Sequence, residues 1–258
     1  MLNGVSVIVT RPQAQAEALI KALSDQGAAV IAVPGLEILP NEENGLDTTF
    51  MDLDRFQHVI FTSINAARLG MERLDSFWPQ WPIGIDWYAI GAGTARVMRE
   101  FQIHALVPEK TNSEGLLALP GLQHLAEQKV LVVKGEGGRP LLPDTLAKRG
   151  ATLMQADVYR RRQPKVSANK QAQVAKAMTA KQPLVMLVSS LESLDNLKCL
   201  LAPNWAALQQ RPLLVVSERI AQHAQKIGFQ KVSVSPKPDD TSVINALEAL
   251  LEHRQGRL

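Results

Sequence analysis

Short runs of β-branched residues alternate along this chain with longer segments in which apolar residues recur at helical spacing. Val5–Val9 is the first such run, and the helical segment that follows it ends at Gly27. This alternation is typical of a parallel sheet with crossover helices, so we predict an α/β fold. The predicted strands are Val5–Val9, Ala28–Val33, His58–Phe61, Trp87–Ile90, Val130–Val133, a strand that reaches Val158, Leu184–Val188 and Leu213–Val216.

The composition is that of a globular protein with one or two domains. The 258 residues correspond to about 1.7 domains if an average domain has roughly 150 residues. With 46% hydrophobic and 21% charged residues the chain can bury a core, which excludes the disordered, coiled-coil and collagen-like classes. A net charge of +3 suits anionic small molecules better than nucleic acid.

The cysteine count and the apolar runs indicate the cellular setting. Cys199 is the only cysteine, which excludes disulfides and cysteine metal sites and favours a reducing compartment. We predict that Cys199 is a small buried side chain on a helix. The first residues lack a secretory pattern, and the longest apolar runs, such as Leu184–Val188, are far shorter than the roughly 20 residues that span a bilayer. We therefore expect a cytoplasmic protein that does not associate with membranes.

The second half of the chain repeats the order of elements found in the first half. Equivalent positions lie 124 to 129 residues apart, as in the pairs Val9 and Val133, Ser63 and Ser190, Ala95 and Ala221, and Ser113 and Ser242. Such regular offsets indicate two similar α/β units.

Two extended connectors that end in proline, residues 34–40 and 158–164, allow two divisions of the chain. If they are the outgoing and returning strands of a hinge, residues 38–158 form one domain, and residues 1–34 with 165–258 form the other. A single cut near residue 129 is the alternative that the residues leave open.

The common cofactor motifs are incomplete. In the two turns that resemble the dinucleotide motif G-x-G-x-x-G, the third glycine is replaced by Arg96 and by Pro140. The chain has no G-x-x-x-x-G-K-[ST] phosphate loop and no G-x-S-x-G nucleophile elbow. The five histidines, at positions 58, 104, 124, 223 and 253, lack the spacing of a metal site, so we predict solvated or capping roles for them and no bound metal.

The turns that follow the predicted strands are rich in small hydroxyl groups and contain few carboxylates. Hydroxyls at these places are ordinary helix caps, and Ser189 with Glu192 forms a predicted capping box. Amides, hydroxyls and a few cations at helix N-termini also suit a ligand with several negative groups. The candidate binding residues are Thr10, Arg11, Thr62, Ser63, Gly91, Thr94, Lys134, Arg139, Ser189, Ser190, Ser217 and Thr241.

Tyr88 and Tyr159 are the two tyrosines. Tyr88 lies inside a predicted strand and is expected in the core. Tyr159 lies in the second connector beside three arginines, where its phenol could reach a cleft between domains and donate a proton. Alternatively, Tyr159 is a strand residue whose ring packs over the linker. Arg160–Arg162 could likewise be a solvated run of charges.

Several short motifs, in order over nearly the whole chain, together resemble the uroporphyrinogen-III synthase family. They are Val9-Thr10-Arg11-Pro12, Phe61-Thr62-Ser63 with Asn65-Ala66, Ala89-Ile90-Gly91 with Thr94-Ala95, Ser113-Glu114-Gly115-Leu116-Leu117, Lys134-Gly135 with Gly138-Arg139, Val158-Tyr159-Arg160-Arg161 and Val216-Ser217-Glu218-Arg219-Ile220-Ala221. The resemblance implies two flavodoxin-like domains joined by a two-stranded hinge, and so favours the inserted-domain division.

The resemblance also implies the substrate and the reaction. Hydroxymethylbilane, a linear tetrapyrrole with eight carboxylates, would bind in the cleft between the domains and close to uroporphyrinogen III with loss of water and inversion of ring D. Arg11, Lys134 and Arg139 would be charge partners of the carboxylates. No cofactor, nucleic acid or membrane is implied, the enzyme would be a monomer, and hand-over from the preceding pathway enzyme is an option.

In the mechanism that the resemblance implies, loss of the hydroxyl gives an azafulvene, which ring D attacks through its substituted carbon. The spirocyclic product then fragments and recloses. Tyr159 matches the family tyrosine proposed to assist departure of the hydroxyl. Two positions depart from the family pattern, since Lys134 stands where arginine is expected and Gly93 where threonine is usual.

Two other functional classes fit parts of the sequence. A non-catalytic, two-lobed anion-binding regulatory module would use the same helix ends without turnover. A nucleotide-dependent enzyme is disfavoured by the incomplete glycine motifs.

Overall fold

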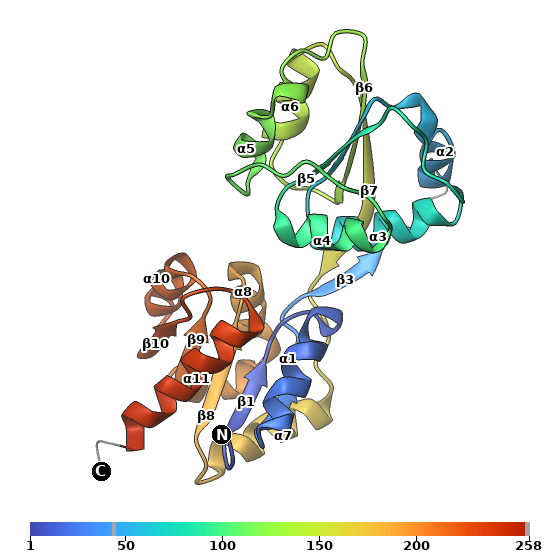
Figure 1. The fold of residues 1–258 in the computed structure, drawn as a ribbon. Coiled ribbons are helices and arrows are strands. Elements are labelled where there is room, and N and C mark those ends of the chain that lie inside the picture. Colours follow the sequence, from blue (N-terminus) through green and yellow to red (C-terminus); the bar gives the residue numbers. More distant parts are fainter. Residues whose placement is uncertain (43–44, 256–258) are drawn as a thin grey trace. The chain divides into compact units, whose positions relative to one another are not determined.

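The computed structural model describes residues 1–42 and 45–255, with side chains up to residue 252. The chain forms two compact units: Met1–Glu37 with Arg162–Leu258, here called the end domain, and Ile38–Arg161, the inserted domain (Figure 1). Each unit is a sheet with helices on both faces, which confirms the predicted α/β class with two domains.

The end domain contains a five-stranded sheet in the order β10-β9-β8-β1-β2, in which neighbouring strands are parallel. The strands are β1 (Ser6–Val9), β2 (Ala29–Ala32), β8 (Leu184–Val188), β9 (Pro212–Val215) and β10 (Lys231–Val234). The chain runs from β1 outward to β2 and later returns to the other side of β1 at β8. Helices therefore leave β1 and β8 toward opposite faces, which makes their junction the topological switch point of the sheet.

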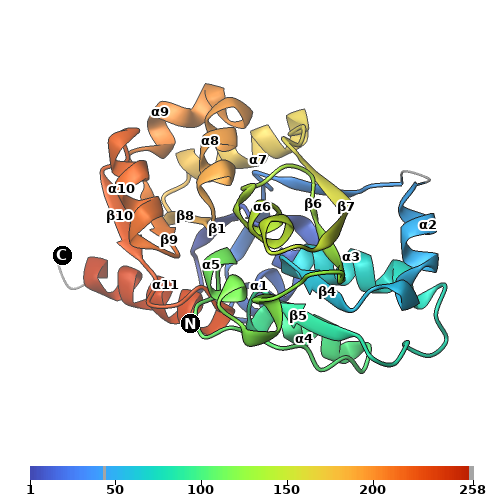
Figure 2. The ribbon, with the colours of Figure 1, turned by 90° about the horizontal axis from the view of Figure 1, so that it is seen from above.

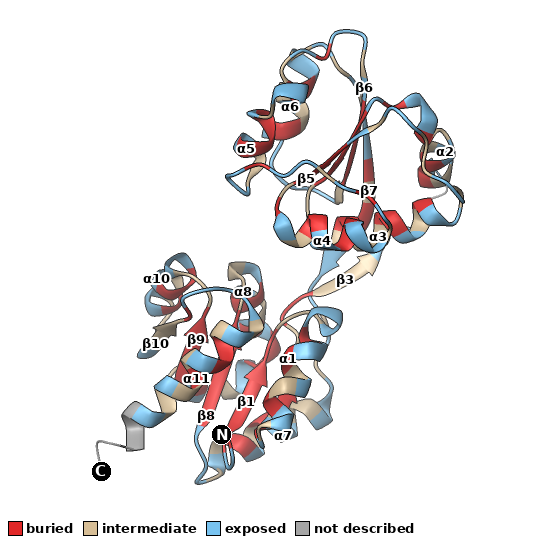
Figure 3. Ribbon diagram, viewed as in Figure 1, coloured by how far each residue is buried: buried red, intermediate tan, exposed pale blue. Residues whose placement is uncertain are grey.

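Two helical layers cover the end-domain sheet. One contains α1 (Gln13–Asp25) and α11 (Asp240–Gln255), and the other contains α7 (Ala168–Thr179), α8 (Leu191–Leu200), the short η3 (Ala202–Asn204), α9 (Trp205–Leu208) and α10 (Glu218–Lys226). The central strands β1, β8 and β9 are buried from end to end, as Figure 3 shows. This is why their sequences are continuous apolar runs and do not alternate with polar residues.

The inserted domain contains a five-stranded sheet in the order β3-β7-β6-β4-β5. The strands are β3 (Glu37–Pro40), β4 (His58–Phe61), β5 (Asp86–Ala89), β6 (Lys129–Gly135) and β7 (Thr152–Arg162). The pairs among β4, β5, β6 and β7 are parallel, and Leu106 adds a short parallel pairing to Tyr88 on β5. The switch point here lies between β4 and β6.

The helices of the inserted domain also form two layers. One layer contains α2 (Gly45–Met51), the short η1 (Leu53–Arg55), α3 (Ile64–Asp75) and α4 (Ala92–Glu100), and the other contains α5 (Ser113–Leu117), η2 (Pro120–Leu122) and α6 (Leu141–Lys148). Figure 2 shows α5 and α6 together on their side of the sheet. Both layers pack on β4 and β6, so the polar turns after these strands are held between two apolar cores.

The strand orders support the internal repeat. The order β2-β1-β8-β9 in the end domain corresponds to β7-β6-β4-β5 in the inserted domain, and Leu106 takes the place of β10. The same four neighbouring strands therefore occur in both sheets. Their order along the chain differs, because the unit β1-α1-β2 comes first in the end domain, whereas its counterpart β6-α6-β7 comes last in the inserted domain. β3, the strand next to β7, is an addition outside this correspondence.

Two side chains differ from the sequence prediction. Cys199 lies on α8 but is exposed, because Leu194, Leu197 and Leu200 form the buried stripe of that helix. His58 is buried in the inserted domain, where Nε2 lies 2.5 Å from Gln128 Oε1 and Nδ1 lies 3.2 Å from the hydroxyl of Tyr88. The predictions of a buried cysteine and of a solvated or capping His58 were therefore wrong.

Candidate active site

The predicted polar turns gather at the switch point of each sheet. In the inserted domain Phe61 pairs with Val133, so Thr62, which begins the turn after β4, lies beside the end of β6 that carries Lys134. In the end domain Val9 pairs with Leu187, and the turns there begin at Thr10 and at Ser189. The structure thus brings the candidate residues together in two groups, one in each domain, at the edge where open α/β sheets bind ligands.

Tyr159 lies at the switch point of the inserted domain. It sits near the end of β7 with only 7% of its surface exposed, and its hydroxyl lies 3.2 Å from the Oγ of Ser63. Ser63 is the N-cap of α3, where its Oγ accepts a hydrogen bond of 3.0 Å from the Ala66 amide. The phenol is therefore held against the positive end of a helix, beside a second group that can carry a proton.

Three of the eight candidate hydroxyls cap helices. Ser63, Ser190 and Ser217 are the N-caps of α3, α8 and α10, and each Oγ accepts from an amide in the first turn. The cap of α8 is thus Ser190 bonded to the Ser193 amide, which corrects the predicted capping box at Ser189 by one residue. Gly91 is the N-cap of α4 and lies against Thr111. A Cβ added at Gly91 would be 3.0 Å from the methyl group of Thr111.

The candidate threonines differ in exposure. Thr10 is fully buried and donates to the carbonyl of Leu187 at 2.7 Å, so its hydroxyl holds the β1 turn against β8. Thr94 is buried in the first turn of α4, whereas Thr241 is exposed in the first turn of α11. Thr62 is half-buried and contacts the carbonyl of Val133 at 3.3 Å.

Each of the three candidate cations lies next to a carboxylate from a different element. Arg11 pairs with Asp240 at 2.5 Å, Lys134 with Asp157 at 2.7 Å, and Arg139 with Glu114 at 3.1 Å. The turns themselves are poor in Asp and Glu, as the sequence indicated, but the neighbouring elements supply carboxylates to them. The composition of the turns alone therefore does not reveal the carboxylates that lie beside their cations.

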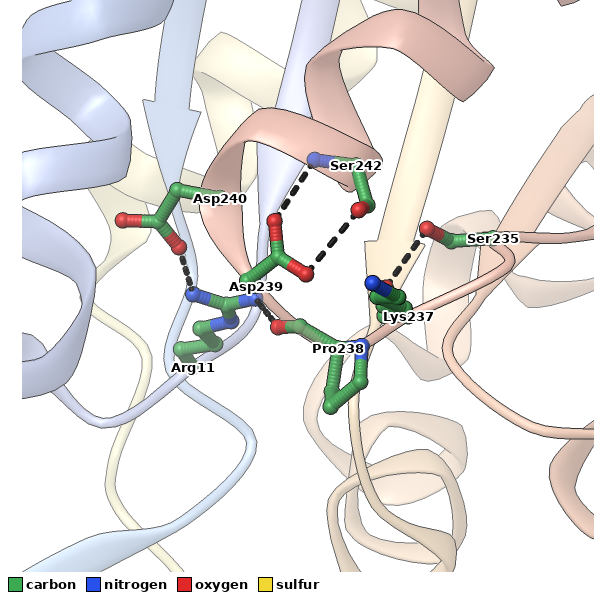
Figure 4. Close-up of polar contacts among 7 residues, drawn as sticks. All are labelled: Arg11, Ser235, Lys237, Pro238, Asp239, Asp240 and Ser242. Carbon is green, nitrogen blue, oxygen red and sulfur yellow. Dashed lines mark hydrogen bonds and ion pairs between the residues drawn. The ribbon is translucent and has the colours of Figure 1, made fainter. Parts of the chain in front are cut away.

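Arg11 ties the turn after β1 to the start of α11, as Figure 4 shows. Besides the ion pair with Asp240, it donates to the carbonyl of Pro238 at 2.9 Å. Beside this pair, Asp239 accepts from the amide and from the hydroxyl of Ser242, both at 2.9 Å. These two hydrogen bonds, the amide first, hold the pKa of Asp239 below its usual range.

Glu114 lies in the first turn of α5, as Asp240 lies in the first turn of α11. Its own backbone amide, followed by the guanidinium of Arg139, holds the pKa of the Glu114 carboxyl below its usual range. The two domains thus share one arrangement. The arginine that follows β1 pairs with a carboxylate in the first turn of α11, and the arginine that follows β6 pairs with a carboxylate in the first turn of α5.

Replacing Arg11 with methionine should destabilise the protein by about 1 to 3 kcal/mol, because two charge-assisted hydrogen bonds are lost and the side chain that makes them is only 14% exposed. Urea denaturation measures the change. The matched control is Lys21→Met, which removes a pair with Asp25 whose side chains are 76% and 62% exposed. That control should cost less than about 0.5 kcal/mol, and equal effects of the two variants would contradict the structural role of Arg11.

The described residues contain no group of three or more His, Cys, Asp or Glu side chains that could hold a metal ion. The same part of the chain contains no helix long and apolar enough to cross a membrane.

Known proteins match this chain over nearly its full length. The family model described as "Uroporphyrinogen-III synthase HemD" matches residues 17–245. The chain is 30% identical to the uroporphyrinogen-III synthases of Escherichia coli K12, over 250 residues, and of Salmonella typhimurium LT2, over 251 residues. Each alignment covers 95% of this chain and 100% of the relative.

Two solved structures share the fold. One is a mutant uroporphyrinogen III synthase from the extremely thermophilic bacterium Thermus thermophilus, with a TM-score of 0.62 and 17% identity over 96% of this chain and 99% of that one. The other is the uroporphyrinogen-III synthetase of Helicobacter pylori 26695, with a TM-score of 0.60 and 15% identity over 95% and 99%. With the family match, these likenesses lead to one conclusion: the chain belongs to the uroporphyrinogen-III synthase family.

Proposed function

We propose that this chain cyclises hydroxymethylbilane to uroporphyrinogen III, with loss of water and inversion of ring D. The family match over residues 17–245 carries this proposal. The structure adds a site of suitable chemistry, since a phenol and a serine hydroxyl meet 3.2 Å apart at the switch point of the inserted domain. The reaction is a dehydration followed by ring closure and changes no oxidation state, so we propose that it needs no cofactor.

The substrate carries eight carboxylates, and the carboxyl edges of both sheets offer groups that bind anions. We assign this binding to the capping turns and to Arg139, with Ser63, Gly91, Ser190, Ser217 and Thr241 at the helix N-termini. Thr62 and Ser189 flank these caps, while the buried Thr10 and Thr94 support the turns from within. The cleft between the domains that the family resemblance implies stays a prediction.

Arg139 can bind a substrate carboxylate by exchanging partners. Its pair with Glu114 is exposed on both sides, at 63% and 51%, so solvent weakens the attraction. A substrate carboxylate can take the place of Glu114 at little cost. Arg11 is different, because its side chain is only 14% exposed and its contacts with Asp240 and Pro238 hold the fold of the turn.

We assign to Tyr159 the role of proton donor to the departing hydroxyl. An ordinary phenol has a pKa of about 10, so such a group assists departure but does not drive it alone. The remaining task of the protein is geometric, because the azafulvene can also close without inversion. Holding ring D so that its substituted carbon attacks is what selects the type III isomer.

The test is the isomer formed from freshly generated hydroxymethylbilane, identified by chromatography after oxidation to the porphyrin. We expect the type III isomer with the protein and the type I isomer without it. A non-catalytic anion-binding module would bind the substrate and leave type I as the product, so a type I product in the presence of the protein would reject the proposal.

We also propose that the enzyme is a cytoplasmic monomer and takes its substrate directly from the enzyme that precedes it. The single cysteine, which leaves no pair for a disulfide, supports a reducing compartment. Sedimentation equilibrium tests the monomer, and a coupled assay with an added trap for free hydroxymethylbilane tests the hand-over.

A further inference from the structure

We infer that Lys134 is a positioning residue for Tyr159 and acts through a bulge in β7, not as a ligand of the substrate carboxylates. The inference rests on the proposed role of Tyr159 as proton donor. It also accounts for the lysine at a position where the family resemblance leads one to expect arginine.

The bulge lies where β7 approaches the switch point. Lys134 pairs with Asp157, but the next residue, Gly135, pairs with Tyr159, so Val158 is an extra residue on β7. A bulge of this kind bends its strand and changes the direction of the next side chain. Here the side chain that follows is Tyr159, whose carbonyl accepts from the Glu136 amide at 2.7 Å and so fixes the strand beyond the bulge.

The ammonium group of Lys134 makes two hydrogen bonds and one ion pair within the inserted domain. Its Nζ lies 2.7 Å from Asp157 Oδ1 and donates to the carbonyls of Gly137 at 2.9 Å and Gly135 at 3.3 Å. Two of the three N–H donors of this lysine thus have backbone carbonyl acceptors, and the ammonium charge is paired with Asp157. Three oxygen atoms that converge on one point suit a compact ammonium and do not match the flat fork of a guanidinium. The geometry thus favours lysine and directs its charge to Asp157 and not to a substrate carboxylate.

Asp157 needs this contact. Its Oδ1 atom is buried, and the Lys134 ammonium is the group that compensates its charge. The backbone of the bulge is held from the other side by Asn41, whose Nδ2 donates to the Asp157 carbonyl and whose amide donates to the Val158 carbonyl, both at 2.9 Å. The two residues that precede Tyr159 are thus fixed by Lys134 of β6 on one side and by Asn41, which follows β3, on the other.

Gly135 completes the arrangement, because the Tyr159 ring lies directly over it. A Cβ at Gly135 would be 2.4 to 2.8 Å from three atoms of that ring. The bulge, the ion pair and the missing Cβ together direct the phenol toward Ser63.

The test uses the fact that the chain has two tyrosines, Tyr88 and Tyr159. Protein labelled with 13C at tyrosine Cζ gives one NMR signal for each, which the variant Y159F assigns. In Lys134→Met we expect the Tyr159 signal to move and the Tyr88 signal to stay. We also expect kcat to fall about tenfold or more with KM changed less than about twofold, because a misplaced donor affects the chemical step and not substrate binding. The control Lys129→Met, at the exposed start of the same strand, should change neither signal nor kcat.

If K134M fails to fold because the Asp157 charge is left unpaired, the variant K134M/D157N removes that charge and should show the same shift of Tyr159. An unmoved Tyr159 signal in a folded variant would overturn the inference, as would a raised KM with unchanged kcat, which marks a substrate ligand. The NMR result is independent of turnover, so it stands even if the wild-type protein yields only type I product and the proposed function fails.

Discussion

Replacing Gly135 with alanine should lower the turnover number by about tenfold or more while the protein stays folded. The added Cβ would lie 2.4 Å from Cζ, 2.6 Å from Cε2 and 2.8 Å from Cε1 of Tyr159, distances that no packed structure tolerates. The ring is almost fully enclosed, with 7% of the residue exposed, so it must shift together with its strand. A shift of about 1 Å in a reacting group can cost a factor of about 100 in rate. Steady-state kinetics with hydroxymethylbilane measures the loss.

The matched control for this variant is Gly45→Ala. Gly45 lies in the first turn of α2 in the same domain, and a Cβ there meets nothing within 4 Å. Its activity should stay within about twofold of wild type, because alanine also favours the helix. If G135A were as active as G45A, the close approach of Tyr159 to Gly135 would have no part in catalysis.

Replacing Tyr159 with phenylalanine should slow turnover by tenfold or more, which corresponds to about 1.4 kcal/mol of barrier. The phenol is the proposed acid, and the variant keeps the ring over Gly135 while it removes the hydroxyl beside Ser63. The isomer should stay type III, because the site still holds ring D in place. Single-turnover kinetics with isomer analysis separates rate from selectivity.

Tyr88→Phe is the control for the loss of a phenol. Tyr88 is fully buried, and burial, with the nearby Asp86 carboxylate adding to it, raises its pKa far above the usual range of a phenol. Its hydroxyl contacts His58 and not the switch point. Y88F should lower stability by about 1 kcal/mol and leave kcat nearly unchanged. A loss in Y159F well under tenfold, or no greater than in Y88F, would argue against an acid role for Tyr159.

The fold could be predicted because local pattern and tertiary packing agree. β4 and β8 have the predicted bounds, since strands buried on both faces of a parallel sheet read as nearly continuous apolar segments. The repeat was visible because the two sheets use the same modules, and the turns after strands were recognisable as caps. Most other strand boundaries shifted by one or two residues, as strand ends commonly do. β7 instead continues past the predicted end at Val158 to Arg162, and β10 was not predicted.

The chemistry of the turns could be predicted only in part, because it depends on contacts between distant residues. Arg11 and Asp240 are 229 positions apart, so the composition of a turn could not show that its cation is paired. Whether Lys134 is free or occupied depends on a bulge in β7, and one extra residue in a strand leaves no mark in an apolar pattern. Cys199 was misjudged for a simpler reason, since it lies one position off the buried stripe of its helix.

The central claim, ring closure with inversion of ring D, can be tested on a single bond of the substrate. Hydroxymethylbilane carrying 13C at the substituted α-carbon of ring D and at the carbon that joins it to ring C shows a one-bond 13C coupling. Attack through that α-carbon, followed by fragmentation and reclosure, breaks this bond and attaches the linking carbon to the other side of ring D. We expect the coupling to be absent from the product formed by this protein. A product that keeps the coupling would show closure without inversion and would contradict the account.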